Sequence, residues 1–137
     1  MELGLKVAGI DHVALNVRDL SRMTAFYRDV LGCSEDLHQE GLGLVHLRAG
    51  SVLIDLIDRK GPLGPGDDAS GRNLNHLCLR VADFDAEDAR AALLAAGVDV
   101  QEVRERYGSD GRARTLYLRD PEGNGVELRS AGGADER

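Results

Sequence analysis

The 137-residue sequence lacks tryptophan and contains only two lysines, Lys6 and Lys60, and two cysteines, Cys33 and Cys78. The scarcity of lysine and a formal net charge of -7 leave no basic surface that would attract a phosphate backbone. We therefore expect no nucleic-acid partner. The cysteines have neither CxxC nor zinc-knuckle spacing, so we expect them to stay reduced and to form no disulfide.

Long apolar runs are also absent. No stretch approaches the roughly 20 apolar residues that cross a bilayer, so we expect no membrane span. Residues 1–7 contain no basic segment followed by a long apolar one, which predicts a cytoplasmic protein without a secretion signal. The composition, 42% hydrophobic and 30% charged, is that of an ordinary globular chain of one domain.

The sequence contains an internal repeat. Residues 10–17 (IDHVALNV) align with residues 74–81 (LNHLCLRV) at a constant shift of 64 positions (76 minus 12), so His12 corresponds to His76. Apolar and polar residues alternate in both segments. This alternation predicts a strand with one buried and one open face at the start of each half.

An amphipathic helix is predicted after each of these strands. Asp19 is the expected N-cap of the first helix and Gly32 its C-terminal glycine, and Asp85 and Gly97 have the same roles in the second. The apolar residues of the first helix recur at helical spacing and are Met23, Phe26, Tyr27, Val30 and Leu31.

Three further strands are predicted in each half. They span 34–39, 43–49 and 51–58 in the first half and 98–105, 113–119 and 124–130 in the second. Both halves therefore have βαβββ order, which predicts an α+β fold. We expect one domain that consists of a first module, a linker, a second module and a frayed tail over residues 1–60, 61–73, 74–131 and 132–137.

Each module opens with a histidine and closes with a carboxylate. Asp55 corresponds to Glu127 at a shift of 72 (127 minus 55), and strand alternation places the histidines and carboxylates on the open faces. Two sheets about a pseudo-twofold axis would bring these groups to one point. Imidazoles and carboxylates together bind first-row divalent metals. The predicted cofactor is one divalent ion, Ni, Zn, Co, Mn or Fe, and the predicted ligands are His12, His76, Glu127 and Asp55.

A plainer interpretation is open for these residues. A single histidine in a strand usually forms ordinary hydrogen bonds, and gene duplication alone would copy it. Glu127 would also suit an edge strand, where a solvated carboxylate limits pairing with another chain. The repetition of both residue types favours the metal site.

The sequence resembles the vicinal oxygen chelate superfamily. The resemblance rests on residues 10–20, 26–32 and 120–128 and on His76, and it spans residues 9–129. The superfamily includes glyoxalase I, fosfomycin-resistance thiol transferases, methylmalonyl-CoA epimerase, extradiol dioxygenases and bleomycin-binding proteins. Such a resemblance indicates the fold more strongly than the reaction.

The resemblance implies an eight-stranded mixed sheet cupped around the metal, with the helices outside and with His12, His76 and Glu127 as ligands. Asp55 stands where glyoxalase I and the epimerase carry a longer Glu or Gln. It is therefore expected at the ion either directly or through a water molecule. The family also implies a homodimer that acts on a small-molecule substrate.

The expected function is a glyoxalase I-like lyase or isomerase, in which the metal stabilises an enediolate and Glu127 or Asp55 moves the proton. One alternative is an Fe(II) extradiol-type dioxygenase, and another is a non-catalytic drug-binding protein of the bleomycin-resistance type. Fosfomycin-type thiol transfer is a further alternative, although the chain has no distinct loop for a monovalent cation. His46 and Tyr117, which correspond at a shift of 71 (117 minus 46), are the expected substrate contacts.

Overall fold

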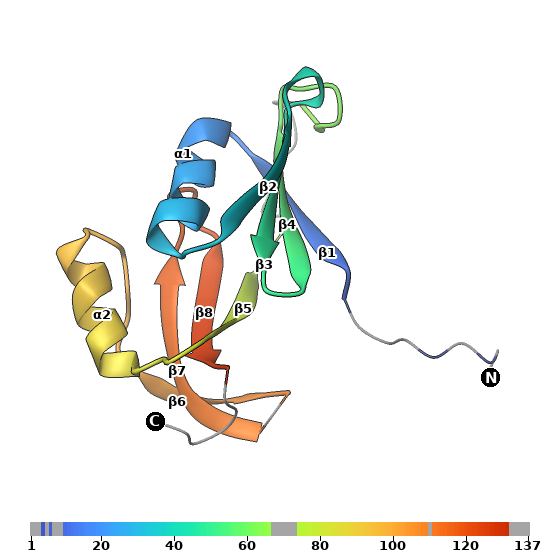
Figure 1. Ribbon diagram of the computed structural model, residues 1–137. Coiled ribbons are helices and arrows are strands. Elements are labelled where there is room, and N and C mark those ends of the chain that lie inside the picture. The colour runs from blue at the N-terminus through green and yellow to red at the C-terminus, as the bar shows by residue number, and fades with distance from the viewer. Residues whose placement is uncertain (1–3, 5, 7–9, 67–73, 110, 132–137) are drawn as a thin grey trace. The chain divides into compact units, whose positions relative to one another are not determined.

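Each half of the chain folds into its own four-stranded mixed sheet with one α-helix (Figure 1). The computed structural model describes residues 4, 6, 10–66, 74–109 and 111–131. The chain divides into two compact units, residues 1–69 and 70–137. The expected linker over 61–73 and the expected tail over 132–137 lie partly or wholly outside the described residues.

The first unit has the element order that the repeat predicts. Its strands pair in the order β1-β4-β3-β2. The elements are β1 (His12–Val17), α1 (Leu20–Ala25), a π-helical turn (Phe26–Val30), β2 (Ser34–Gln39), a 3-10 turn (Glu40–Leu42), β3 (Leu44–Ala49) and β4 (Val52–Asp58).

The second unit repeats this topology, with its strands in the order β5-β8-β7-β6. Its elements are β5 (His76–Val81), α2 (Ala86–Ala95), β6 (Arg104–Gly108), β7 (Gly111–Arg119) and β8 (Gly125–Ser130). In both units the first and last strands run parallel, and the remaining neighbours are antiparallel. The predicted α+β class and the two βαβββ modules are therefore confirmed.

The predicted helix signals act as expected. The Asp19 side chain accepts a hydrogen bond from the amide of Arg22, and the Asp85 side chain accepts from two amides of the first turn of α2. Gly32 and Gly97 have φ values of +84° and +79°, which a glycine tolerates after a helix. None of the helices among the described residues is long and apolar enough to cross a membrane.

The core of each unit is apolar and follows the alternation of the strands. α1 contacts β3 and β4, and α2 contacts β7. The residues with less than 2% exposure include Leu15, Val17, Met23, Tyr27, Leu47, Ile54 and Leu56 in the first unit and Leu116, Leu118 and Val126 in the second. The polar residues of the same strands are left on the other face, where the candidate site lies.

The strand predicted over 98–105 is placed too early in the chain, because the structure begins β6 at Arg104. Val100 is buried but forms only an isolated bridge with β7. The apolar pattern that suggested a strand here therefore reflects packing of Val100 in the core and not a ladder of hydrogen bonds. The β6–β7 ladder runs from Arg104 opposite Thr115 to Gly108 opposite Gly111.

A buried aspartate fixes the turn that leads into β8. Asp120 Oδ1 accepts hydrogen bonds from the amides of Glu122 and Asn124 at 2.9 and 3.0 Å, and Oδ2 accepts from the Asn124 side chain at 2.8 Å. Asp120 and Asn124 are both buried. The turn thus sets where β8 begins, and with it the place of Glu127 in the sheet.

We predict that Asp120→Ala lowers the free energy of unfolding by roughly 2–4 kcal/mol, because hydrogen bonds to a charged acceptor are lost and a buried amide is left without one. Urea denaturation followed by circular dichroism measures the change. The matched control is Asp99→Ala, which removes an exposed carboxylate of the same unit and should cost less than about 0.5 kcal/mol. Equal losses in the two variants would contradict the assigned role of the turn.

Candidate metal site

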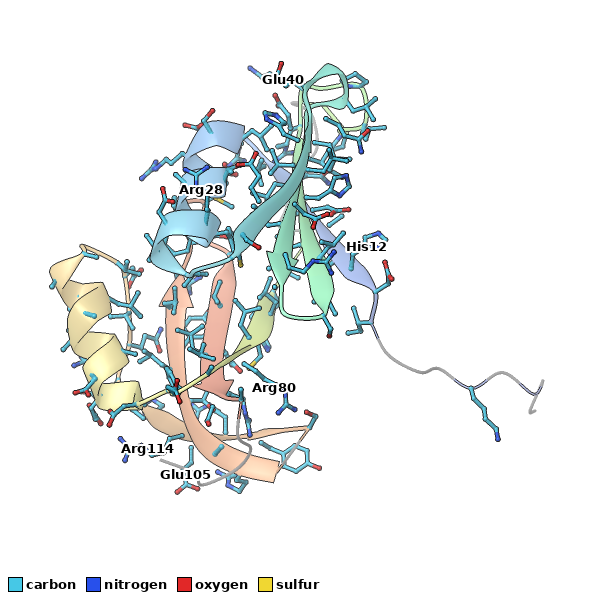
Figure 2. All side chains as sticks on the ribbon, viewed as in Figure 1. His12, Arg28, Glu40, Arg80, Glu105 and Arg114 are labelled. Carbon is cyan, nitrogen blue, oxygen red and sulfur yellow. The ribbon has the colours of Figure 1, made fainter. Side chains whose placement is uncertain are left out.

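His12 and Asp55 lie together on neighbouring parallel strands of the first unit. In the β1–β4 ladder, Leu53 is opposite His12 and Asp55 is opposite Ala14, so the two polar side chains share one face. His12 Nε2 lies 4.0 Å from Asp55 Oδ2. The side chain of His12, labelled on β1 in Figure 2, is 51% exposed, and the side chain of Asp55 is only 11% exposed.

His76 and Glu127 repeat this arrangement in the second unit. In the β5–β8 ladder, Gly125 is opposite His76 and Glu127 is opposite Cys78, which is the same register as in the first unit. His76 Nε2 lies 3.9 Å from Glu127 Oε2. The two histidine–carboxylate pairs are therefore structurally equivalent, as the sequence repeat predicts.

The spacing of each pair fits two ligands of one metal ion. Nitrogen and oxygen ligands lie about 2.0–2.2 Å from a divalent zinc ion, so two ligand atoms about 4 Å apart are near the upper limit for contact with the same ion. The described residues contain no cluster of three or more His, Cys, Asp or Glu side chains that could hold a metal. The structure brings the four predicted ligands together as two pairs, one in each unit.

The residue before each histidine holds the ring in the form that a metal ligand needs. His12 Nδ1 lies 2.8 Å from Asp11 Oδ2, and His76 Nδ1 lies 2.8 Å from Asn75 Oδ1. When Nδ1–H donates to these oxygens, Nε2 keeps its lone pair, and Nε2 is the atom nearest the carboxylate of each pair. Both units therefore present Nε2 of the histidine beside a carboxylate oxygen.

Negative charge around His12 favours its protonated form. The hydrogen bond that His12 donates to Asp11, and after it the charge of Asp55, raise the pKa of His12 above its ordinary value. Because a metal binds the neutral imidazole, protons compete for His12 at a higher pH than for an ordinary histidine.

In each sheet, the strand next to the one with the carboxylate, β3 or β7, places a further site residue opposite that carboxylate. In the first unit, His46 is opposite Asp55 in the β3–β4 ladder, and its Nδ1 lies 2.8 Å from Asp55 Oδ1. The other ring nitrogen of His46 lies 2.9 Å from the side-chain nitrogen of Gln39 on β2. The predicted site residues His46 and Asp55 are therefore in direct contact.

In the second unit, Tyr117 is opposite Glu127 in the β7–β8 ladder, at the position equivalent to His46. The Tyr117 hydroxyl occupies the space that a Cβ atom would need at Gly125, and His76 lies at the same place. The Arg119 guanidinium lies 5.6 Å from the centre of the tyrosine ring. Gly125 thus allows the tyrosine to lie across β8 beside the candidate ligands.

A cavity of about 400 Å³ opens at this face of the second unit. It is lined by Asn75, His76, Gln101, Glu102, Arg104, Arg106, Thr115, Tyr117, Arg119 and Glu127. Sequence reasoning missed Arg104 and Arg106, which stand two residues apart on β6 and so share one face. The spacing of these arginines could have indicated a shared face, but the strand predicted over 98–105 ends before Arg106.

Both cysteines are free thiols, as expected. Cys78 is exposed on the same strand as His76, and its pKa is raised to about 11, first because protein atoms exclude water from the sulfur and then because Glu127 is negative. A thiol with this pKa is protonated at neutral pH in the metal-free protein.

We predict that Asp11→Asn lowers the pKa of His12 toward its ordinary value of 6.5, because the substitution removes the negative charge beside Nδ1. An NMR titration of the imidazole signals in metal-free protein measures the shift. The matched control is Asp36→Asn, which removes an exposed carboxylate of the same unit that does not act on His12 and should leave the pKa of His12 unchanged. A His12 titration that is unaffected by the substitution would contradict the assigned hydrogen bond.

Known proteins resemble the chain along most of its length. Residues 9–128 match the family model of the Glyoxalase/Bleomycin resistance protein/Dioxygenase superfamily. A virulence protein of Salmonella typhimurium is 31% identical over 121 residues, which cover 87% of this chain and 81% of the relative. The metallothiol transferase FosB of Staphylococcus epidermidis is 27% identical, with 89% of this chain and 83% of the relative covered.

A solved structure supports the same assignment. Lactoylglutathione lyase from Agrobacterium tumefaciens superposes with a TM-score of 0.68 at 26% identity, and the match covers 91% of this chain and 95% of the lyase. The family match, the repeated βαβββ topology and the placement of the histidine–carboxylate pairs agree with one another. The chain belongs to the glyoxalase, bleomycin resistance protein and dioxygenase superfamily, also called the vicinal oxygen chelate superfamily.

Proposed function

We propose that the protein is a divalent-metal-dependent enzyme whose ion is held by His12, His76 and Glu127, with Asp55 as a fourth ligand or beside the ion. The observation that carries this proposal is the equivalent histidine–carboxylate pair in each unit, at 4.0 Å and 3.9 Å. Each histidine also has its Nδ1 occupied by the preceding side chain, which leaves Nε2 available as a ligand.

The proposed reaction is a lyase or isomerase reaction of the glyoxalase I type on a small oxygenated substrate. A bound divalent ion would supply Lewis-acid stabilisation of the negative charge that develops on adjacent substrate oxygens. The similarity to the solved lactoylglutathione lyase favours this reaction class. The ligand set of nitrogen and oxygen atoms, without a thiolate, agrees with a catalytic site and not a purely structural one.

Glu127 and Asp55 are the candidates for moving the proton. The Glu127 side chain is 20% exposed and lines the cavity of the second unit, so a substrate there can reach it. The Asp55 side chain is 11% exposed, and one of its oxygens is engaged by His46. Access therefore favours Glu127 as the proton acceptor, with Asp55 as the alternative.

The substrate contacts are proposed from the cavity of the second unit. Tyr117 presents a hydroxyl beside His76, and Arg104 and Arg106 add positive charge to the wall. Such a wall suits a substrate that carries an anionic group. The contact predicted for His46 is disfavoured by the hydrogen bonds on both of its ring nitrogens.

A second candidate function is metal-dependent transfer of a thiol to a small molecule. The similarity to a metallothiol transferase favours it. The two reactions differ in product: isomerisation of a hemithioacetal yields an α-hydroxy thioester, whereas addition of a thiol to an epoxide breaks a C–O bond of the ring and yields a hydroxy thioether. A substrate screen should therefore pair α-ketoaldehyde hemithioacetals with epoxides plus thiol, and should measure thioester in the first and thioether in the second.

We predict that the purified, untagged protein binds about one divalent ion per chain, and that His12→Ala, His76→Ala and Glu127→Ala each weaken binding at least tenfold, because each removes a ligand. Elemental mass spectrometry and titration of metal-free protein with Zn²⁺, Ni²⁺, Mn²⁺ or Fe²⁺ measure this. His38→Ala is the control, because it removes an exposed histidine of β2 that faces Glu35.

A wild-type protein that binds none of these ions would overturn the enzymatic proposal and would leave a binding protein on the same fold. Loss of metal in the His38 variant as well would show that the titration does not report on the site. Oxygen consumption with a catechol by the Fe²⁺-loaded protein would instead indicate a dioxygenase.

We also predict that Glu127→Gln lowers kcat on an identified substrate by about 10²–10⁴-fold at saturating metal, because an amide accepts no proton in the reaction. Asp55→Asn should reduce kcat by a smaller factor if Glu127 is the acceptor. Metal content is measured on the same samples. Normal turnover by both metal-loaded variants would contradict the proton-transfer role of these carboxylates.

A further inference from the structure

Asp55 is a buried carboxylate whose two oxygens face different histidines. Oδ1 lies 2.8 Å from His46 Nδ1, and Oδ2 lies 4.0 Å from His12 Nε2. Asp55 stands between Ile54 and Leu56, which are 1% and 0% exposed, so its backbone is anchored in the core. The orientation of the carboxylate therefore depends on what its two oxygens contact.

The hydrogen bonds around His46 have a defined direction. The side-chain nitrogen of Gln39 lies 2.9 Å from His46 Nε2, and an amide nitrogen can only donate, so Nε2 accepts. In the neutral ring the proton then lies on Nδ1, which donates to Asp55 Oδ1. Gln39, His46 and Asp55 thus form a donor chain across β2, β3 and β4 that ends on one carboxylate oxygen.

We propose that His46 is a positioning residue of the metal site, which holds Asp55 by Oδ1 so that Oδ2 faces the ion beside His12. This inference rests on the proposed metal-binding function. Asp55 is one methylene shorter than Glu127, and a short side chain reaches the ion only from a restricted orientation. The hydrogen bond from His46 supplies that restriction and so accounts for an aspartate at this position.

Among the described residues of the second unit, the carboxylate is held differently. Tyr117 occupies the position equivalent to His46, opposite Glu127. Within the part of the chain that the structure describes, Glu127 has an ion-pair contact with His76 but no hydrogen bond from a neighbouring side chain. The two modules therefore share one backbone register and differ in how firmly each carboxylate is held.

The test compares metal affinity in four single variants of the full-length protein. His46→Leu removes the donor, His46→Asn keeps an amide nitrogen near the position of Nδ1, and His46→Gln moves the amide toward the position of Nε2. His38→Leu is the matched control, since His38 lies on the neighbouring strand and contacts Glu35 at 3.9 Å. Dissociation constants for Zn²⁺ and Co²⁺ come from competition with a chelator, and the visible absorption of the Co²⁺ protein reports on its ligands.

We expect His46→Leu to weaken binding by about 10- to 100-fold and to change the Co²⁺ spectrum, as loss of a partner of a ligating carboxylate typically does. His46→Asn should restore most of the affinity, and His46→Gln should restore less. His38→Leu should bind as the wild type does. In an Asp55→Ala background, His46→Leu should cause no further loss, because His46 acts through Asp55.

Each outcome decides the matter. If the wild type binds metal and His46→Leu binds it equally tightly with an unchanged Co²⁺ spectrum, the positioning role is wrong and the proposed function stands. If the wild type binds no metal, both proposals fail. If His46→Leu does not fold by circular dichroism, the comparison of His46→Asn with His46→Gln carries the test, and equal affinities in those two overturn the positioning role.

Discussion

Parallel pairing between the first and last strands of each unit places a histidine and a carboxylate on one face of the sheet, and the candidate site depends on that register. Side chains alternate along a strand, so a slip of one residue between β1 and β4 would turn His12 toward the buried face. The buried Leu15 and Leu56, which are direct partners in this ladder, oppose such a slip. The packing of the apolar face therefore fixes the register that places His12 and Asp55 side by side on the other face.

β3 and β7 occupy equivalent positions in the two sheets, but they place different residues opposite the carboxylate. His46 opposite Asp55 gives the first unit a restrained carboxylate. Tyr117 opposite Glu127 gives the second unit a carboxylate that opens onto a cavity. A duplicated module can diverge in this way without loss of the fold, because the changed residues lie on the open face. This difference agrees with the separate roles proposed for the two carboxylates, Asp55 beside the ion and Glu127 in contact with substrate.

Local patterns were enough to predict much of this structure. The strand alternation and the caps Asp19 and Asp85 depend on residues close in sequence, and the repeat is visible by comparing the two halves, so these features were predicted correctly. The position of β6 was not, since buried Val100 imitates a strand without forming a ladder. The bond between His46 and Asp55 also escaped prediction. Alternation shows which face a side chain shares, but the strand neighbours and the rotamers decide which atoms meet.

Asp55 and Arg129 are equally buried, at 8% exposure each, but they make different kinds of contact. Arg129 donates to the backbone carbonyls of Arg106 and Gly111, so its charge closes the β6–β7 hairpin and serves the fold. Asp55 bonds instead to the side chain of His46 on the neighbouring strand. A buried polar pair of this kind is often no more stabilising than apolar residues of similar size. The pair therefore need not be present for stability, which agrees with the role proposed for Asp55 at the metal site.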